Sequence, residues 1–562
     1  MRRSTAAFIA MSALFVSLLI SAHCLERVGV ANIRSTKIYS GGLSIAITTW
    51  EPAEERVGTI VLIHGVLASK EMMYPLASDL VRVGWRVILV DQMGHGGTEG
   101  QYILSTKDLE DSVRALGKIF NQTKDYRAAI INYLKDILAP NESIVFGGHS
   151  LGAFLAMVLA GEVQKDLNVL ATIAIAPPYF PSIVNSSTPR NLLICLGKYD
   201  EFIGLDAAKM YLNPTNPVVI KPGRLYGSFL NGTARMIFVS ELSDHLLEPY
   251  DPKIISKVLE WIDNARGIVG VRYVVLGTLI AEFKALAGLI GIAIVALIPP
   301  MISSRLGMIS GGKRFPAMRY VKTTIVVSVV VWPLLTVVLL AGFLSGIVTI
   351  AGRTGYVVPV LVSGYLFVAT IAILFSSSIL SRSSVKSCIQ KTLLSIKSDF
   401  GRGTVLGIIE ALIFIIVLQV TYGSILISMI PQTLGRFLVF IPTAFAVFWY
   451  FMFHEYFYRA QIQEIFGGRR HIAIILSILT SLASKVTVML TITFLIYIVS
   501  PIKVIAIFSL IGMTIIALLT EGLAAASYYA TREIYPHALA SAIVWASIVA
   551  AAFPTAKLIV ML

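Results

Sequence analysis

The stretch Ser143-Ile-Val-Phe-Gly-Gly-His-Ser-Leu-Gly152 decides how the first half of the chain folds. A short apolar run precedes Gly-His-Ser-Leu-Gly, and an apolar, alanine-rich segment at 153–160 follows it. This order predicts a buried strand, a sharp turn and a helix. Glycines at 148 and 152 carry no side chains, so the strand and the helix can close around the turn. The spacing predicts Ser150 as an exposed nucleophile, with a purely structural turn as the alternative.

The composition indicates a chain that lies mostly in a membrane. Its 562 residues are 56% hydrophobic and only 14% charged, and the mean hydropathy is +0.79, which excludes an ordinary soluble enzyme of this length. The net charge of +14 suggests nucleic acid at first. We expect no nucleic-acid partner, because the basic residues of the second half lie between hydrophobic spans, as topology signals do. Membrane lipids are the expected surroundings, and the sequence indicates no oligomeric state.

The cysteines of the chain indicate neither a disulfide nor a metal site. The chain has three cysteines, Cys24, Cys195 and Cys388, and none has a near partner in the sequence. Neither a disulfide framework nor a zinc site built from thiolates is expected.

The amino terminus resembles a targeting segment. Arg2 and Arg3 precede an apolar run at 6–22, so residues 1–24 are expected to be a signal peptide or a signal anchor. Either one places the following domain across the membrane. Asn-x-Ser/Thr sequons begin at Asn121, Asn141, Asn185 and Asn231, and the chain has no asparagine after Asn264. This distribution agrees with an exported first half.

Residues 37–267 are predicted to form one α/β domain. Short apolar runs alternate with helical patterns, which is typical of parallel strands covered by helices on both faces. The predicted strands are 59–63, 86–91, 144–146, 169–176, 192–196 and 236–239, and the predicted helices include 72–83 and a closing helix at 254–265.

Several motifs of this region together resemble the α/β-hydrolase superfamily, nearest to its serine aminopeptidase and monoacylglycerol-lipase-like branch. The motifs are His64-Gly65-Val66, the segment 91–100 (Asp-Gln-Met-Gly-His-Gly-Gly-Thr-Glu-Gly), the 148–152 turn, Gly197-Lys198-Tyr199-Asp200 and Ser243-Asp244-His245. The resemblance implies a doubly wound sheet and a catalytic triad in the order Ser, Asp, His.

Roles follow for the matching residues. Ser150 is the expected nucleophile and His245, in the loop after the last strand, the expected base. Asp200 follows the 192–196 strand and would orient His245. The backbone N–H groups of Leu151 and Val66 are the expected oxyanion donors. This chemistry needs no metal ion and no cofactor.

Rival residues lie close to these positions. Asp244 adjoins His245, but sequence neighbours rarely face each other well enough to form the orienting bond, so Asp200 is favoured over Asp244 and over Glu201. His149 and His95 are interpreted as packing or turn residues. His64 is expected to brace the oxyanion loop through hydrogen bonds.

The predicted domain has only a short insertion where related lipases and esterases carry a lid. Residues 177–190, which include four prolines, separate the two strands concerned, and the prolines stiffen the loop. An open pocket is expected, whose missing wall the membrane surface or the segment 205–233 would supply.

Residues 281–562 are predicted to form a multi-pass helical domain of about eight helices, each near the length of roughly 20 residues needed to cross a bilayer. The connecting segments 302–323 and 381–403 and the region after residue 453 are rich in Lys and Arg. The positive-inside rule then places them in the cytoplasm and the α/β domain outside. The predicted spans are 283–301, 325–349, 357–380, 405–429, 437–453, 473–499, 504–523 and 538–560.

Ionisable residues inside spans are expensive and indicate a polar site. Glu455, Arg459 and Lys485 are the candidates, and Glu455 and Arg459 are spaced to pair on one helix face. Residues His454-Glu455 and Arg459 weakly resemble the Glu-Glu-x-x-x-Arg motif of the CAAX-protease-like (CPBP) membrane family, with His454 in place of the first glutamate. Expected histidines are replaced, so the resemblance implies a degenerate scaffold rather than a protease.

The sequence therefore predicts a membrane-anchored, extracytoplasmic serine hydrolase that cleaves an ester, either a small acyl ester or a monoacyl lipid, through an acyl-enzyme. A serine aminopeptidase acting on an amide is one alternative. Another is a non-catalytic receptor or transport-associated protein whose hydrolase-like domain only binds. A third places the main activity, as a channel or carrier, in the membrane domain around Glu455 and Lys485.

Overall fold

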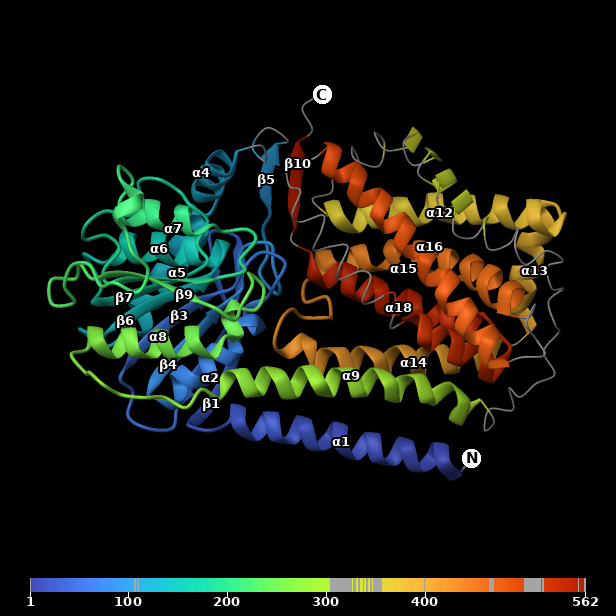
Figure 1. Cartoon of the computed structure of the whole chain (residues 1–562), viewed down its shortest axis with the longest axis horizontal. Helices are drawn as coiled ribbons and strands as arrows, with labels where there is room; N and C mark the ends of the chain where they lie inside the picture. Colours follow the sequence, from blue (N-terminus) through green and yellow to red (C-terminus); the bar gives the residue numbers. More distant parts are fainter. Residues whose placement is uncertain are drawn as a thin grey trace.

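The structure is a computed structural model of the whole chain (Figure 1). It describes residues 2–105, 108, 111–303, 326, 330–331, 334–336, 338–339, 342–343, 346, 356–398, 400–463, 470–499, 517, 520–553 and 555–559. The predicted spans at 325–349 and 504–523 and the predicted basic loop at 302–323 lie largely outside these residues.

One eight-stranded sheet organises the first half of the chain, with strand order β1-β2-β4-β3-β6-β7-β8-β9. β1 and β2 form an antiparallel hairpin, β2 runs antiparallel to β4, and the remaining neighbours are parallel. The central strands are continuous apolar runs because helices cover both faces. The strands are β1 (Val30–Ser40), β2 (Leu43–Pro52), β3 (Gly58–Ile63), β4 (Trp85–Val90), β6 (Ile144–His149), β7 (Val169–Ile175), β8 (Leu192–Gly197) and β9 (Arg235–Ser240).

Helices pack on both faces of the sheet and form separate cores. One face carries α4 (Ser112–Gln122), α5 (Lys124–Ile137) and α6 (Leu151–Val163). The other carries α2 (Tyr74–Arg82), which follows the short η1 (Lys70–Met73), and the closing helix α8 (Pro252–Ala265). α7 (Leu205–Leu212) packs beside α6 at the end of the sheet, and the short η2 (Pro217–Val219) and η3 (Glu248–Tyr250) lie in loops. The predicted α/β fold is confirmed.

Two parts of this domain differ from the sequence-based expectation. The sheet begins at Val30, before the predicted boundary at residue 37, because β1 and β2 extend it at one edge. α4 and α5 fill the region before β6, which the apolar pattern alone left unassigned. We call residues 30–265 the α/β domain.

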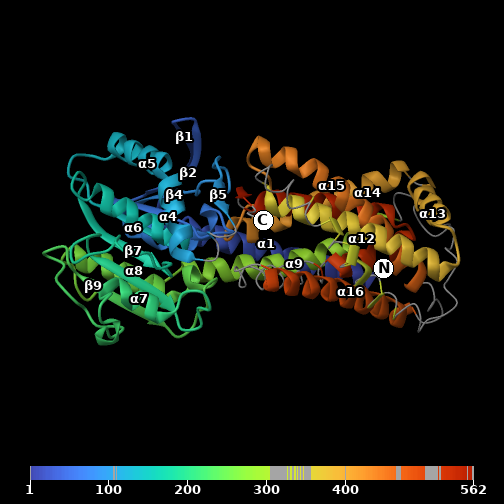
Figure 2. The ribbon, with the colours of Figure 1, turned by 90° about the horizontal axis from the view of Figure 1, so that it is seen from above.

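The rest of the chain forms a helical domain beside the α/β domain (Figures 1 and 2). Six helical segments among the described residues are long and apolar enough to cross a membrane, so this is a membrane protein. α1 lies along α9 in both views, and Lys284 Nζ of α9 lies 2.9 Å from Glu26 Oε1 of α1. The elements are α1 (Arg2–Glu26), α9 (Gly277–Ile302), α12 (Val357–Ser381), α13 (Val385–Ser398), α14 (Phe400–Val420), η5 (Tyr422–Ser424), α15 (Leu434–Glu455), the π-helical η6 (Tyr456–Gln463), α16 (Arg470–Val499) and α18 (Tyr535–Ala552).

The last predicted span, 538–560, is wrong at its end. α18 stops at Ala552, and residues 556–559 form β10, which pairs in parallel with β5 (Tyr102–Ser105) of the α/β domain. Phe553 leaves the helix with an extended backbone, the conformation favoured by a residue that precedes proline. The carboxyl-terminal segment therefore returns to the α/β domain.

The two domains meet at the carboxyl edge of the parallel sheet. Leu426 O accepts a bond from the backbone of Ser69, in the loop after β3, over 3.2 Å. Tyr250, in the loop after β9, donates its hydroxyl to Ile425 O over 2.6 Å. The loop after β4 is held by Arg436 Nη2, which lies 2.8 Å from Gly94 O. The edge at which strands of an α/β sheet present their ligands therefore faces the helical domain.

Candidate active site

The turn at Ser150 places its hydroxyl on the carboxyl edge of the sheet. Ser150 joins β6 to α6 with φ 54° and ψ −124°, a region that residues other than glycine rarely occupy. A Cβ at Gly148 would lie 2.5 Å from the backbone of Gly152, and one at Gly152 would collide with Ile63 O. Only glycine fits at both positions, so the close approach of strand and helix holds the turn in this strained shape.

Three predicted residues meet at this turn in one hydrogen-bonded chain. His245 Nε2 lies 3.0 Å from Ser150 Oγ, and His245 Nδ1 lies 3.0 Å from Asp200 Oδ2. Asp200 Oδ1 in turn accepts bonds of 2.8 Å from the backbone N–H groups of Phe202 and Ile203. The carboxylate is therefore fixed by its own loop and aimed at the imidazole.

The rivals of Asp200 have other contacts. Asp244 Oδ1 accepts bonds from the backbone N–H groups of Leu246 and Leu247, at 3.1 and 2.9 Å, so it caps the turn that carries His245. Glu201 is exposed. The structure brings Asp200, and neither rival, to His245 Nδ1.

The two expected oxyanion donors belong to segments that lie next to Ser150. Leu151 is the first residue of α6, and the first N–H groups of a helix have no partner within it. Val66 belongs to the loop after β3, which passes the nucleophile closely: a Cβ at Gly65 would lie 3.2 Å from Ser150 Cβ. Both backbone groups are thus carried by segments that border the hydroxyl.

His64 braces this loop, as the sequence suggested. Its Nδ1 bonds Gly65 O at 2.7 Å, and its Nε2 accepts from the backbone N–H of Gln92 at 3.0 Å. Burial lowers the pKa of His64 to about 4, although nearby Asp91 opposes the shift. The imidazole is therefore neutral and structural at neutral pH. His95 is also buried, and burial lowers its pKa to about 3.

Asp91 ties the loop after β4 to the start of α2. It is fully buried, and Lys70 Nζ lies 3.0 Å from its Oδ2 while the backbone N–H of Gly97 donates to the same oxygen at 2.9 Å. Burial alone would raise the pKa of Asp91, but Lys70 acts together with smaller contributions that include the backbone N–H groups of Gly97 and Lys70, and their sum holds the pKa below its usual range. This ion pair and the bond from Gly97 fix the glycine-rich turn at 94–97.

The sequence analysis missed Glu248, a second buried carboxyl group at the triad. Its Oε1 accepts from the backbone N–H of Gly197 at 2.5 Å, and its Oε2 lies 3.4 Å from His149 Nε2 and 4.0 Å from His245 Nδ1. Burial, then Asp200, raises the pKa of Glu248 well above its usual range. The only feature of the sequence that could have pointed to Glu248 is its position three residues after His245.

Apolar side chains border the mouth of the site. Val66 and Leu246 are each 40% exposed and Leu247 is 50% exposed. The ring of Phe202 lies 4.8 Å from that of His245. Exposed apolar groups gathered at one place on a surface mark contact with an apolar partner.

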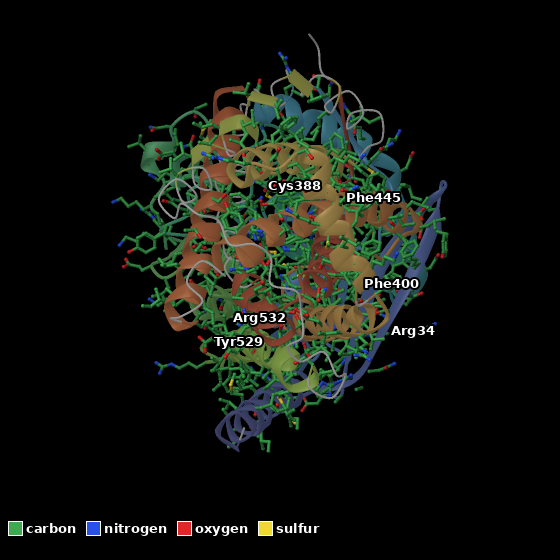
Figure 3. All side chains as sticks on the ribbon, turned by 90° about the vertical axis from the view of Figure 1, so that its right-hand side faces the viewer. Arg34, Cys388, Phe400, Phe445, Tyr529 and Arg532 are labelled. Carbon is green, nitrogen blue, oxygen red and sulfur yellow. The ribbon has the colours of Figure 1, made fainter. Side chains whose placement is uncertain are left out.

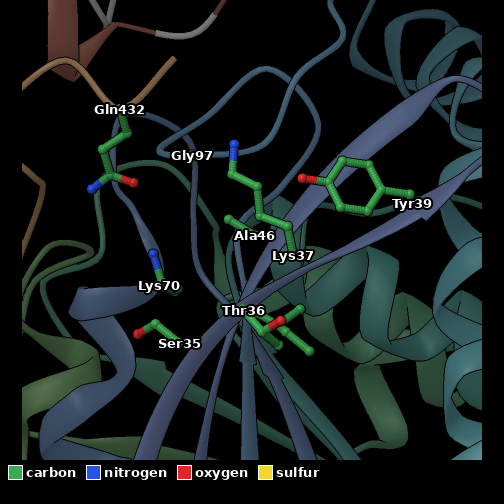
Figure 4. A pocket seen from close by; sticks show the side chains of 9 residues that line it. Ser35, Thr36, Lys37, Tyr39, Ala46, Lys70, Gly97 and Gln432 are labelled. Carbon is green, nitrogen blue, oxygen red and sulfur yellow. The ribbon is translucent and has the colours of Figure 1, made fainter.

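Two cavities lie elsewhere. One, of about 420 Å³, lies at the junction of the domains, and its lining includes Lys70, Gly97 and Gln432 (Figure 4). Lys70 is already paired with Asp91 and Glu71. The other, of about 690 Å³, is apolar and lies between α12 and α15, near Tyr356 and Gly435.

The membrane-domain candidates also lie together. Glu455 Oε2 lies 3.0 Å from Arg459 Nε, as the helix spacing predicted. Glu521 pairs with both Arg459 and Lys485. All four side chains are buried.

Within the described part of the chain, two sets of side chains have the donor types of a metal site. They are His149, His245 and Glu248, and His454, Glu455 and Glu521, each with its atoms within 4.8 Å of one another. In the first set a metal ion would displace the triad bonds of His245, and in the second Arg459 and Lys485 already neutralise the carboxylates. Neither arrangement favours a metal ion.

Comparison with known proteins identifies the fold. Residues 58–225 match the model of a family described as "alpha/beta hydrolase fold". Similar solved structures include a CIB-like hydrolase from Thermoplasma acidophilum (17% identity, TM-score 0.31, 43% of this chain and 100% of that one) and an esterase from Pyrobaculum calidifontis (15%, 0.31, 46% and 93%). A membrane phospholipase A described as a bacterial virulence factor is another (13%, 0.29, 47% and 99%). No curated protein matches the chain.

Proposed function

We propose that the α/β domain is a serine hydrolase that cleaves the ester bond of a membrane-associated acyl substrate. The observation that carries the proposal is the chain from Ser150 Oγ through His245 to Asp200, with both bonds at 3.0 Å, on a strained strand–helix turn. A structural turn has no need of this chain. The matched family supports a hydrolase in general terms.

The geometry supports the following reaction. His245 Nε2 takes the proton of Ser150 as Oγ attacks the ester carbonyl, and Asp200 stabilises the imidazolium that forms. The N–H groups of Leu151 and Val66 stabilise the negative oxygen of the tetrahedral intermediate. His245 then gives the proton to the leaving alcohol, and water repeats the sequence on the acyl-Ser150 ester to release the acid.

The surroundings of the site favour an acyl substrate from the bilayer. The exposed side chains of Val66, Leu246 and Leu247 border the site, and the same edge of the sheet contacts the helical domain through Ser69 and Tyr250. An acyl chain entering from the lipid would find apolar contacts beside Ser150 without a lid insertion. A monoacyl lipid ester therefore fits better than a small soluble ester or a peptide.

The charge distribution supports an outward-facing α/β domain. α13, at the end of the helical domain farthest from the α/β domain (Figure 1), carries Lys386, Lys391 and Lys397 without an acidic residue. Figure 3 looks at this end, where Phe400 begins α14. Basic segments remain in the cytoplasm, so the α/β domain belongs on the opposite side.

Labelling with a membrane-impermeant fluorophosphonate tests the proposal in intact cells. We expect labelling of the wild-type protein and its loss in Ser150→Ala, because only an activated serine reacts. Ser186→Ala, in an exposed loop, keeps the Asn185 sequon and is the matched control, which should label normally. Labelling that persists in Ser150→Ala would contradict the assignment, and labelling only after lysis would reverse the proposed orientation.

A further inference from the structure

The loop that carries Val66 is held at its two ends. Bonds to residues of the loop after β4 hold it at His64, over 3.0 Å, and at Lys70, over 2.8 Å. Among the described residues, none donates or accepts a hydrogen bond at residues 66–68. Leu67 has φ 60°, a conformation that a bulky residue rarely adopts and that the surroundings must maintain. The place of the Val66 N–H therefore depends on what fixes the end of this turn.

The residue at that end, Ser69, is bonded to the helical domain. Its backbone N–H donates to Leu426 O over 3.2 Å, and the backbone N–H of Ser428 donates to Ser69 Oγ over 3.1 Å. Ser69 is fully buried, and its hydroxyl donates in turn to Glu71. Both bonds from the helical domain come from one short segment, residues 425–430, which we call the support segment.

The support segment is itself firmly held within the helical domain. Its alternate side chains, Ile425, Ile427 and Met429, are buried, and the last two belong to an apolar cluster of that domain. Gln419 Oε1 of α14 accepts from the Met429 N–H over 2.8 Å, and Ser547 Oγ of α18 donates to Met429 O over 2.7 Å. The helices α14 and α18 therefore determine where the support segment meets Ser69.

The support segment also contacts the part of the chain that follows His245. Tyr250 donates its hydroxyl to Ile425 O over 2.6 Å, and its own carbonyl accepts from Thr278 Oγ1 of α9 over 2.6 Å. Tyr250 ends η3, the short helix that contains Glu248 beside the triad. One segment of the helical domain thus bonds the oxyanion loop and the segment that follows the proposed base.

A role in attachment alone explains these contacts less well. The domains are already joined through Arg436 and Gly94 and through the bonds of α9 to Asp79. Contacts that serve only attachment could lie anywhere on the α/β domain. Those of the support segment lie on two loops next to Ser150, where a small displacement of a backbone N–H changes the rate of a reaction.

We propose that the support segment is a positioning element of the hydrolase site, and that Ser69 is the positioning residue through which it sets the place of the Val66 N–H. This inference rests on the function proposed above. The helical domain then acts on the reaction as well as anchoring the enzyme, because the oxyanion loop takes its active shape only against that domain.

Kinetics of the purified full-length protein with a chromogenic acyl ester test the proposal. Complete labelling with a fluorophosphonate counts the active sites. Ser69→Ala removes the acceptor of the Ser428 N–H, so kcat per labelled site should fall about 10- to 100-fold while KM stays within about twofold, because the lost stabilisation belongs to the transition state. Ser78→Ala removes a buried hydroxyl whose 2.7 Å bond to Pro75 O stays within α2; it is the matched control and should keep the wild-type kcat.

Two further measurements separate displacement of the oxyanion loop from a general structural defect. A trifluoromethyl ketone with the same acyl chain forms an oxyanion on Ser150, so its affinity for Ser69→Ala should fall by the same factor as kcat/KM. The pH at which kcat/KM falls on the acid side reports His245 and should not change. A defect of folding would lower the labelled fraction instead.

Ser547→Ala tests the same inference from the helical domain and decides it if Ser69→Ala does not fold. Ser547 bonds the support segment from α18, so loosening that segment should lower kcat about 3- to 10-fold. Ser376→Ala is its matched control, because Ser376 is buried in α12 and its hydroxyl has no hydrogen-bond partner among the described residues.

The outcomes distinguish this inference from the function on which it rests. Wild-type kcat per labelled site in Ser69→Ala or in Ser547→Ala would overturn the inference alone, and so would a defect of Ser69→Ala that is confined to KM. A wild-type protein that neither turns over the ester nor accepts the label would overturn the proposed function, and this inference with it.

Discussion

At the scale of one residue, the fold holds the backbone of Ser150 in a strained conformation at the place where the proposed reaction occurs. A serine with φ 54° costs about 1–3 kcal/mol of backbone strain, and the surrounding packing must supply that energy. The side chain of Asp200 is also held rigidly, because two backbone N–H groups donate to its Oδ1. Rigid placement of Ser150, His245 and Asp200 would reduce the reorganisation that the proposed reaction requires.

A comparison of Asp200→Asn with Asp244→Asn tests which of these two carboxylates orients His245. Asparagine keeps the loop contacts of Asp200 but cannot stabilise the imidazolium of His245, so ester turnover should fall about 10³- to 10⁴-fold. Asp244→Asn is the matched control, because an asparagine still accepts the turn bonds from Leu246 and Leu247. The measurement is the hydrolysis rate of a chromogenic acyl ester by both purified variants. A larger loss in Asp244→Asn would exchange the two roles.

His64 should make the stability of the α/β domain depend on pH. The folded protein keeps His64 neutral down to a pKa of about 4, whereas the unfolded chain protonates it near 6.5. The unfolded state therefore binds the proton first as the pH falls, and about 3 kcal/mol of stability is lost between pH 6.5 and 4. Melting temperatures of wild type and His64→Gln across this range test the effect. A wild-type loss no larger than that of His64→Gln would refute it.

The residues proposed for catalysis could be named from the sequence because their signals are local. Ser150 lies in a turn that only one spacing of glycines permits, and Asp200 and His245 each follow a recognisable strand. Glu248 was not predictable, because only folding brings its carboxyl between His149 and His245.

The element scale is best illustrated by the end of α18 and the strand that follows it. Arg436 of α15 donates Nη1 to the carbonyls of Ala550, Ala551 and Phe553, each at 2.8 Å, and Nη2 to Gly94. One guanidinium thus caps the last turn of α18 and joins it to the α/β domain. β10 then adds a parallel strand beside β5.

Arg436→Lys should release this connection without removing the charge. Lysine cannot reproduce the planar fork of donors that serves four carbonyls, and unsatisfied buried carbonyls cost about 1–3 kcal/mol each. Hydrogen exchange at residues 102–105 should become faster, while exchange in β6 should not change. Arg402→Lys, outside the junction, is the control. Unchanged exchange at β5 would show that β10 pairs without help from Arg436.

Most central elements were predictable from apolar runs, because buried parallel strands are apolar on both faces. β1 was not assigned, since its burial pattern is largely exposed and polar. α4 and α5 mix polar and apolar residues and gave no clear boundary. β10 had no local signal, because its partner β5 lies at the other end of the sequence.

At the scale of the whole molecule, the α/β domain is attached to the helical domain at several points. The chain enters from α1 and leaves into α9, whose first N–H groups bond Asp79 of α2, with Gly277 N 2.8 Å from Asp79 Oδ2. The residues around Leu426 and the strand β10 add two more contacts. The overall division into two domains followed from composition, whereas this many-sided attachment depends on contacts between distant residues.

Cys24 offers a test of topology and of the fate of α1. It is the exposed cysteine, near the α/β end of α1, whereas Cys195 and Cys388 are buried. We propose that α1, which pairs Glu26 with Lys284 of α9, is retained as an anchor. An impermeant maleimide should therefore label intact cells, and Cys24→Ser should abolish the labelling. Labelling only after permeabilisation would invert the topology, and no labelling at all would mean that α1 is removed.

The attachment of the α/β domain to the helical domain at several points also determines which substrate concentration sets the rate of the proposed enzyme. With the proposed lipid ester as substrate, an α/β domain that cannot swing away from the bilayer would sample substrate in two dimensions, so its rate would follow the number of ester molecules per unit of membrane area. Mixing an inert lipid into the same membrane would slow turnover even if the total amount of substrate in the suspension stayed constant. The effective concentration at Ser150 is then a property of the membrane's composition and not of the solution around it.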